Sequence, residues 1–391
     1  MPSPTALFLH QWKIIPVAIL LIIWTIFSLH QQYHDESHPG TTVPTIKEKS
    51  SQETHSGSET ALPAAALAPL PSKESASAET SIQSQAALHN SQATPPAPHN
   101  SQTHPSPPQK AQDPNRTLIL YTYSESPSSR SNLEYFLKKG LHGSADFLFV
   151  INGDANASSL IPSKPNIQII VRENDCFDLG TIGAVLAKDG LWKKYKRFIT
   201  LNASIRGPFL PAYSSGACWS DVFLGRITEK IKLVGTSMNC QPWPHVQSML
   251  LATDDVGISI LLNPSLANTV HRNDFFGNVD DLTGFTPCYG SMHKAIHGEM
   301  GLTELIRQQG YEVDVLLAAF QAETPTTYCA ANGNPEDILY EGHYFGTNVH
   351  PYELVFIKAN RNIDPTLLDK MTSWHLSQNT SAWDTCGALS T

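Results

Sequence analysis

A long stretch of this 391-residue sequence lacks almost all aromatic residues and all cysteines. Between residues 31 and 113 the only aromatic side chain is Tyr33, and Ser, Thr, Pro, Ala, Gln and His predominate. Such a composition buries too little apolar surface to offset the entropy cost of ordering the chain. We therefore expect residues 31–113 to form a disordered stem.

Lys and Arg are also few, 26 residues against 35 Asp and Glu. The formal net charge is −9, and only 16% of the residues are charged. Nucleic-acid-binding domains usually gather positive charge on one face, so no nucleic acid partner is expected. The sequence has no G-x-x-x-x-G-K-S/T phosphate loop, no H-E-x-x-H zinc motif and no G-x-S-x-G elbow, which argues against three common enzyme classes.

One long apolar run lies near the N-terminus. Residues 14–29 contain no charged side chain, and no small-x-small cleavage site follows them, which favours an uncleaved anchor over a signal peptide. Lys13 precedes the run and Asp35 and Glu36 follow it, which favours a cytosolic N-terminus. We expect a cytosolic tail at residues 1–13, a transmembrane signal anchor at residues 14–30 and a lumenal body. This single-pass type II protein would reside in the Golgi or another secretory-pathway membrane, since a short span suits a thinner bilayer.

All six cysteines lie after the stem. An even number in an oxidising compartment predicts one to three disulfides, but six cysteines allow 15 pairings and the sequence does not choose among them. No C-x-x-C pair is present, which argues against a zinc site. N-x-S/T glycosylation sequons fit lumenal exposure and occur at Asn115, Asn156, Asn202 and Asn379.

The body alternates short β-rich runs with helical patterns. Strands are expected at residues 118–123, 147–151, 167–171, 197–201, 231–234, 248–252 and 312–316, and helices at 132–139, 181–191 and 299–309. Thr253 is expected to cap a further helix that has Asp254 and Asp255 in its first turn. Alternation of this kind predicts an α/β fold with a mostly parallel sheet flanked by helices. We assign residues 114–325 to this domain and residues 326–391 to a loop-rich C-terminal extension.

The first polar stretch that could bind a ligand follows the third predicted strand. It contains Glu173, Asn174 and Asp178, and Gly180 would let the backbone come close to a ligand. Carboxylates and an amide at a strand end can hydrogen-bond sugar hydroxyls or a nucleobase edge. The alternative for Asp178 is that it only caps the helix that follows.

A second stretch follows the fourth predicted strand, and together the two resemble a known family. Residues 172–180 match R-E-N-x-x-(F/Y)-D-x-G, and residues 201–209 match L-N-x-S-x-x-G-P-F. Residues 247–251 (Q-S-M-L-L) and 299–303 (E-M-G-L-T) continue the pattern in the same order. Across residues 118–317 the chain resembles the rhamnan-synthesis protein F family of glycosyltransferases.

The resemblance implies a GT-A-like (Rossmann-like) fold and transfer of a sugar from a nucleotide-sugar donor to a hydroxyl of a glycan acceptor. Carried onto this chain, it assigns to the donor site Tyr123, Glu173, Asn174, Asp178, Gly180, Asn202, Ser204, Arg206 and Gly207. The alternative for residues 202–209 is a turn that uses Gly207 and Pro208 for their backbone geometry.

One position departs from the family pattern. Many relatives read L-N-D-S, in which the Asp takes the place of the metal-binding acidic motif, and this chain has Ala203 there. Magnesium and manganese prefer hard oxygen ligands, and Asn202 and Ser204 alone are weak ones. No metal or other cofactor is firmly expected. Arg206 could neutralise the donor diphosphate instead, because a guanidinium can bond two phosphate oxygens at once.

A base for the acceptor hydroxyl is the last requirement of an inverting transferase. Glu299 is the first candidate, because it matches the E-x-G-L-T segment and stands at the expected start of a helix; there it could also be only a favourable first-turn charge. Asp221 and Asp255 are the reserve candidates. Ala203 leaves open a catalytically inactive sugar-nucleotide or glycan-binding protein, and a stem-anchored hydrolase is disfavoured because no pair of carboxylates in a glycosidase context stands out.

Overall fold

The computed structural model describes residues 115–153, 155–321, 323–330 and 337–387. The chain divides into two units, Met1–Pro98 and His99–Thr391, and all described residues belong to the second. None of the described helices is long and apolar enough to span a bilayer. The predicted tail (1–13), anchor (14–30) and stem (31–113) lie outside the described residues.

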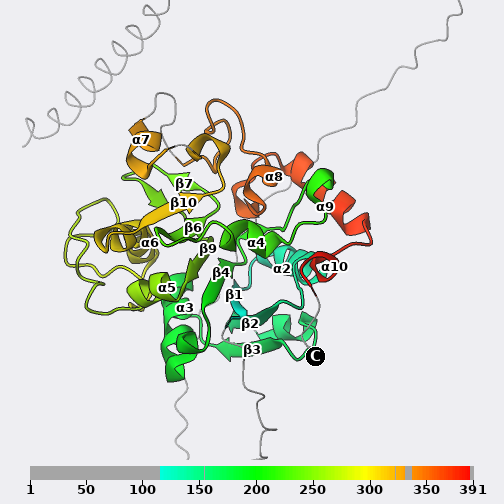
Figure 1. The fold of residues 1–391 in the computed structure, drawn as a ribbon, viewed down its shortest axis with the longest axis horizontal. Helices are drawn as coiled ribbons and strands as arrows, with labels where there is room; N and C mark the ends of the chain where they lie inside the picture. The colour runs from blue at the N-terminus through cyan, green and yellow to red at the C-terminus, as the bar shows by residue number, and fades with distance from the viewer. Residues whose placement is uncertain (1–114, 154, 322, 331–336, 388–391) are drawn as a thin grey trace, which may run out of the picture. The chain divides into compact units, whose positions relative to one another are not determined.

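A seven-stranded sheet forms the centre of the second unit (Figure 1). Its strand order is β10-β6-β9-β4-β1-β2-β3, and all neighbours are parallel except that β9 runs antiparallel to β6 and β4. The bounds are β1 Thr117–Ser124, β2 Ala145–Asn152, β3 Ile167–Arg172, β4 Arg197–Asn202, β6 Ile231–Gly235, β9 Leu250–Asp254 and β10 Glu312–Val315. The predicted mostly parallel sheet is confirmed.

Burial of the strands follows their position in the sheet. β1 and β2 are buried almost throughout, which fits their continuous apolar sequences, because helices cover both faces of a parallel sheet. β3 is one of the two edge strands, and its Ile169 and Val171 are exposed.

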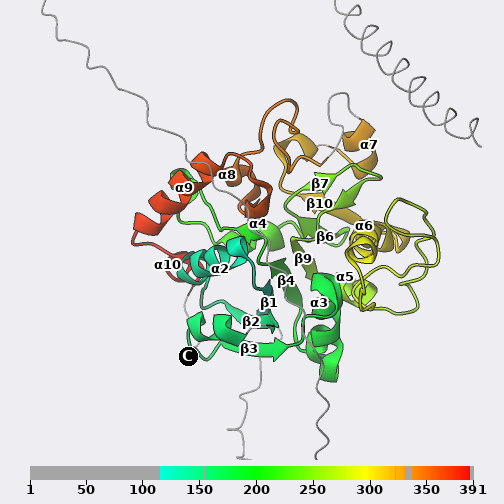
Figure 2. The same cartoon turned by 180° about the vertical axis from the view of Figure 1, so that it is seen from behind.

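Helices cover the two faces of the sheet. α2 (Pro127–Lys139) and α4 (Trp219–Leu224) lie on one face, and α3 (Phe177–Ala187), α5 (Asp255–Leu261) and α6 (Met292–Gln308) lie on the other, as Figures 1 and 2 show from opposite sides. α2 begins five residues before the predicted start, because Ser126 and Ser129 form a capping box and Pro127 occupies the first turn.

Three further helix starts differ from the predictions. α3 begins at Phe177, so Asp178 lies in its first turn. α6 begins after its N-cap Ser291 and not at Glu299, which therefore stands in the middle of the helix. Asp254, rather than Thr253, caps α5: its carboxylate accepts hydrogen bonds from the next turn, while the Thr253 hydroxyl donates 2.6 Å to the Lys232 carbonyl in the sheet.

The C-terminal segment packs in the same unit and reaches back to the sheet. Its strand β11 (Ile357–Lys358) pairs antiparallel with β5 (Ile205–Arg206), directly after β4. The remaining elements are the strands β7 (Met238–Asn239) and β8 (His245–Val246), the helices α7 (Pro325–Ala330), α8 (Pro351–Leu354), α9 (Pro365–Ser377) and α10 (Ala382–Thr385), and the 3-10 turns η1 (Ala155–Leu160), η2 (Lys188–Lys194), η3 (Ala212–Ser214), η4 (Ala318–Phe320) and η5 (Ala359–Arg361).

Three disulfides use all six cysteines: Cys176–Cys288, Cys218–Cys386 and Cys240–Cys329. The sequence alone left their pairing open. Each bridge closes a long loop, which stabilises the fold mainly by restricting the unfolded chain.

Candidate functional site

The strand order reverses between β1 and β4. The chain proceeds from β1 to β2 and β3 on one side, and β4 then returns to the other side of β1. In open α/β sheets, ligands bind beyond the carboxyl ends of the strands at such a switch point. Thr122 near the end of β1, Asn202 at the end of β4 and Asp178 in the first turn of α3 meet here. Asn202 Nδ2 donates 2.8 Å to Asp178 Oδ2, and Thr122 Oγ1 lies 3.3 Å from Asp178 Oδ1.

A cavity of about 680 Å³ opens at this point, within the size range of small-molecule sites. Its walls come from the start of α3, the turn after β4, residues 239–249, Phe275 and Phe276, α6 and residues 337–361. Four of the residues assigned from the sequence line it: Asp178, Asn202, Ser204 and Glu299.

Asp178 is half-buried in the cavity wall. Burial raises the pKa of its carboxyl from the ordinary 3.8 to about 6. Hydrogen bonds from Thr122 and Asn202 and the charge of Lys358 act in the opposite direction, whereas the Glu299 carboxylate raises the pKa further. Asp178 is not the N-cap of α3, because Cys176 occupies that position and makes no side-chain hydrogen bond to the helix.

Glu299 reaches the cavity from the middle of α6. Its Oε1 accepts a 2.7 Å hydrogen bond from the backbone N–H of Ser248, which holds the side chain in place. Asp178 and Glu299 come from different helices on the same face of the sheet and line one cavity. The arrangement provides two carboxylates that are positioned independently.

Two cations in the cavity wall come from the C-terminal segment. Lys358 is placed by the pairing of β11 with β5, and the described residues offer it no ion-pair partner. Arg361 lies over the ring of Tyr340, with 4.3 Å from its guanidinium carbon to the ring centre, and 3.7 Å from Asp337. Sequence reasoning missed both, because they stand far along the chain outside any motif. The β-rich residues before Lys358 could have indicated a strand in this segment.

Arg206, the cation assigned from the sequence, lies outside the lining of the cavity. Its Nε donates 2.9 Å to Asn132 Oδ1, and its other nitrogens reach Thr372 and Ser131. Asn132 in turn donates 2.9 Å to the Ala203 carbonyl. Arg206 thus links the turn after β4 to α2 and α9 on the side away from the cavity.

Ala203 also faces away from the cavity. Ala203 is 4% exposed and belongs to the hydrophobic core, while its neighbours Asn202 and Ser204 line the cavity. Asn202 Oδ1 accepts 2.6 Å from the Ser204 hydroxyl. The Asn202 amide is thus bonded within the site, which leaves this sequon poorly placed for glycosylation.

The other residues assigned to the donor do not line the cavity either. Glu173 and Asn174 are exposed, and buried Tyr123 donates 2.7 Å to Glu125 Oε2. Gly180 and Gly207 are packed closely against other parts of the backbone. A Cβ at Gly180 would lie 2.6 Å from the Pro287 carbonyl, and one at Gly207 would lie 2.6 Å from the Val355 carbonyl.

The two reserve carboxylates lie elsewhere. Asp255 follows β9, whose end pairs with the start of β4 at Arg197, so it stands at the other end of the strands from the cavity, where it pairs with Lys196. Asp221 is exposed in the first turn of α4, on the other face of the sheet. The antiparallel direction of β9, which the strand pattern does not reveal, accounts for the position of Asp255.

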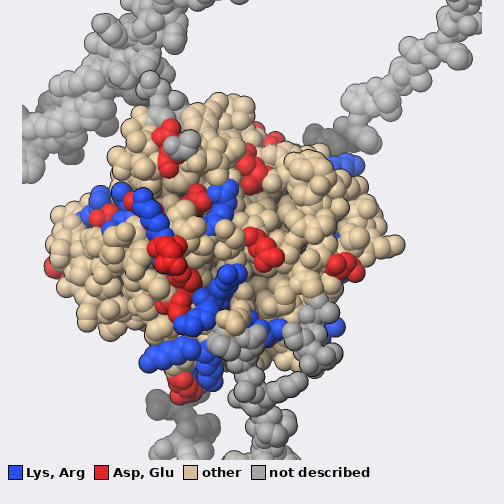
Figure 3. Space-filling view, in the orientation of Figure 1, with Lys and Arg blue, Asp and Glu red and all other residues tan. Residues whose placement is uncertain are grey.

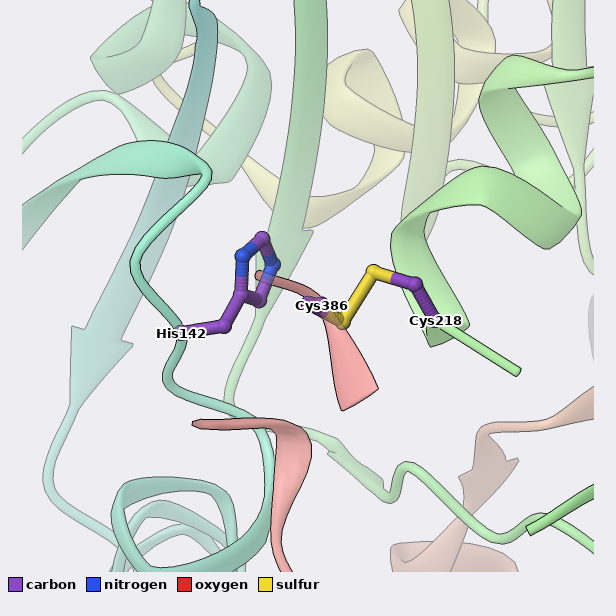
Figure 4. A group of neighbouring side chains, drawn as sticks. All are labelled: His142, Cys218 and Cys386. Carbon is purple, nitrogen blue, oxygen red and sulfur yellow. A yellow bond between two sulfur atoms is a disulfide. The ribbon is translucent and has the colours of Figure 1, made fainter. Parts of the chain in front are cut away.

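Metal-ligating side chains gather in two places among the described residues, and neither is the cavity. One group is His142, Cys218 and Cys386, in which the sulfurs are joined to each other beside the buried imidazole (Figure 4). The other is Asp175, Cys176 and Cys288, again with a disulfide. Asp178, Glu299 and Asp337 line the cavity but do not form such a group.

Charged side chains elsewhere show no dominant sign on the face drawn in Figure 3, where acidic and basic residues are interspersed.

No protein-family profile matches the chain, and no curated protein sequence matches it. Partial likenesses to solved structures include the WbbM bifunctional glycosyltransferase (9% identity, TM-score 0.26, 38% of this chain and 34% of that one) and the glycosyltransferase GlyE of Streptococcus pneumoniae TIGR4 (7%, 0.30, 51% and 45%). A third is 4-diphosphocytidyl-2C-methyl-D-erythritol synthase (10%, 0.28, 51% and 89%). The chain thus spans less than half of each of the first two proteins, and TM-scores of this size carry no argument about function.

Proposed function

We propose that this protein is a glycosyltransferase that moves a sugar from a nucleotide-sugar donor to a hydroxyl of a glycan acceptor. The observation that carries the proposal is the meeting of Asp178, Glu299 and Lys358 around one cavity at the switch point of the sheet. The four sequence motifs that resemble the rhamnan-synthesis protein F family, and the GT-A-like fold they imply, are the second support.

Lys358 and Arg361 provide positive charge for the donor diphosphate. A charge-assisted hydrogen bond to phosphate is roughly twice as strong as a neutral one. The Asp178 carboxylate, oriented by Asn202, accepts a hydrogen bond from a hydroxyl of the donor, either on its sugar or on its ribose.

Glu299 acts as the general base. Its free carboxylate oxygen takes the proton of the acceptor hydroxyl as that oxygen bonds the anomeric carbon. The bond from the anomeric carbon to the diphosphate breaks, and its electron pair stays on the phosphate oxygen, where the nearby cations stabilise the added charge. This inverting route needs no covalent intermediate.

A catalytically inactive sugar-nucleotide or glycan-binding protein is the second candidate. Ala203 motivated it, because relatives carry a carboxylate at that position. The burial of Ala203 in the core weakens this argument, since its side chain is not part of the cavity wall.

The proposed setting is a secretory-pathway membrane, with residues 14–30 as the anchor and the body in the lumen of the Golgi. Three exposed sequons, Asn115, Asn156 and Asn379, suit that compartment, and three disulfides suit it as well.

The first test is donor turnover by the purified full chain in mild detergent. UDP-, GDP- and TDP-sugars would be supplied singly with a mixed glycan acceptor panel, with and without EDTA, and nucleotide release measured. Release from one donor that Glu299→Gln abolishes would support the proposal, and resistance to EDTA would support the role of Lys358 and Arg361. Nucleotide binding without release would favour the inactive candidate, and absence of both would refute the transferase assignment.

A further inference from the structure

The mouth of the cavity carries an exposed aromatic surface, formed by Phe275, Phe276 and His293, which we call the aromatic rim. Phe275 is 81% exposed although it is a large apolar residue. Its ring centre lies 5.3 Å from that of Phe276 and 5.7 Å from that of His293. Phe275 and Phe276 both line the cavity. An exposed aromatic cluster at the mouth of a cavity is a common mark of a ligand contact surface.

A buried hydrogen bond between Asp274 and His297 holds the rim in place. Asp274 Oδ2 lies 2.5 Å from His297 Nδ1, and their side chains are 1% and 0% exposed. Asp274 Oδ1 accepts hydrogen bonds from the backbone N–H groups of Phe276 (2.5 Å) and Gly277 (2.9 Å). A Cβ at Gly277 would lie 2.5 Å from His297 Cγ, so only glycine lets the loop approach α6 this closely. These contacts hold the loop that carries the exposed Phe275 against α6.

The same helix carries both this support and the proposed base. Ala295 and Ile296 precede Glu299 by four and three residues on α6, so they lie on the same side of the helix, about one turn of 5.4 Å away. Both line the cavity, as does Met292 one turn further towards the N-terminus. An apolar strip thus runs from the rim to the Glu299 carboxylate.

The cations lie in a different part of the wall. Lys358 and Arg361 come from the C-terminal segment, and Lys358 is close enough to Asp178 to lower its pKa. The charged side of the cavity suits a nucleoside diphosphate, which leaves the apolar side to the second substrate. A pyranose ring has a face of C–H groups that packs on aromatic rings, while its hydroxyls point sideways towards polar groups such as Glu299.

We propose that the aromatic rim and the apolar strip of α6 form the acceptor subsite, in which a saccharide ring stacks on Phe275 and presents a hydroxyl to Glu299. Naming the saccharide as an acceptor rests on the proposed transferase function, whereas stacking of a saccharide on the rim does not.

The test uses two readouts on the full chain, so that failure of each idea can be told apart. A printed panel of N-glycan, O-glycan and glycosaminoglycan oligosaccharides measures saccharide binding without any donor. Fluorescence titration with UDP and GDP measures nucleotide binding. The variants are Phe275→Ala, the conservative Phe275→Trp, and Tyr213→Ala as a matched control, because Tyr213 is 93% exposed and lies outside the cavity.

We expect Phe275→Ala to weaken binding of the preferred saccharide roughly fivefold to tenfold, which is the scale of one aromatic contact. Phe275→Trp and Tyr213→Ala should retain it, and nucleotide affinity should be unchanged in all three. Saccharide binding that is insensitive to Phe275→Ala, or absent in the wild type, would overturn the proposal. Loss of nucleotide affinity in Phe275→Ala would also overturn it, by showing that the rim stacks on a nucleobase. Failure of donor turnover with rim-dependent saccharide binding intact would overturn only the transferase function.

Discussion

The amide nitrogen of Asn202 donates a 2.8 Å hydrogen bond to Asp178 Oδ2, which joins the end of β4 to the first turn of α3. The two residues stand 24 positions apart and belong to two separate sequence motifs. Their contact unites these motifs in one site, and it orients a carboxylate whose pKa burial raises to about 6.

Asp178→Asn should lower turnover even at pH 8, and its remaining activity should lack the acidic limb of the wild type. In the wild type, turnover should fall as the pH is lowered through about 6, because the proposed hydrogen bond to the donor needs the ionised carboxylate.

The stability of the wild type should change with pH in the opposite direction. Folding favours the protonated carboxyl of Asp178, so stability is lost as pH rises from about 4 to about 6. Asp178→Asn should therefore melt higher than wild type at pH 8 while losing activity. A pH series of melting temperatures, with Asp221→Asn as control, checks this, and a variant less stable than wild type at pH 8 would contradict it.

Glu299→Gln should lower kcat by about 10²- to 10⁴-fold, the usual contribution of a general base. Gln keeps an Oε1 that can accept the Ser248 N–H, so the fold and donor affinity should change little. Single-turnover kinetics and donor titration separate the two effects. A loss of donor affinity with kcat unchanged would assign Glu299 to binding instead.

Lys358→Ala should lower donor affinity, whereas Arg206→Ala should lower the stability of the fold. Loss of Lys358 should weaken donor affinity about 10- to 100-fold, because it removes a charged partner of the diphosphate. Loss of Arg206, whose side chain is 12% exposed, should mainly lower the free energy of unfolding by about 1–3 kcal/mol, since it leaves the buried Asn132 Oδ1 without its donor. Lys370→Ala, an exposed change on α9, is the control. Donor affinity that depends on Arg206 and not on Lys358 would restore the assignment made from the sequence.

Cys176→Ser with Cys288→Ser should reduce both stability and donor affinity. Cys176 precedes Asp178 by two residues, and its partner Cys288 belongs to the loop that packs on α3 at Gly180. The double change Cys218→Ser with Cys386→Ser is the matched control, because neither these residues nor their sequence neighbours line the cavity, whereas Phe177 next to Cys176 does. Each pair should cost about 2–5 kcal/mol in denaturant unfolding. Equal donor affinity in the two double variants would show that the Cys176 bridge has no role in shaping the site.

Local patterns predicted the strands well and the helix starts poorly. The apolar runs of β1, β2 and β4 are visible in the sequence because buried parallel strands are continuously apolar. The start of α6 was missed because its first turns contain Gly298, a weak helix former, and because the cap at Ser291 depends on a backbone conformation that the sequence does not display. The consequence was functional, since Glu299 lies within a helix and not at its positive end.

The sequence by itself determined the α/β class, the alternation of strands and helices, and the candidacy of Asp178, Asn202, Ser204 and Glu299. The class and the alternation follow from hydrophobic period, which is a local property of the chain. Asp178 was also marked by strand-end polarity, whereas Asn202, Ser204 and Glu299 became candidates through the motifs that resemble the rhamnan-synthesis protein F family. Only the tertiary structure decided that Lys358 and Arg361 stand beside them, that Arg206 and Ala203 face away, and how the cysteines pair. Those outcomes depend on strand order and direction and on contacts between distant segments, such as the pairing of β11 with β5, which join residues about 150 positions apart and leave no periodic trace in the sequence.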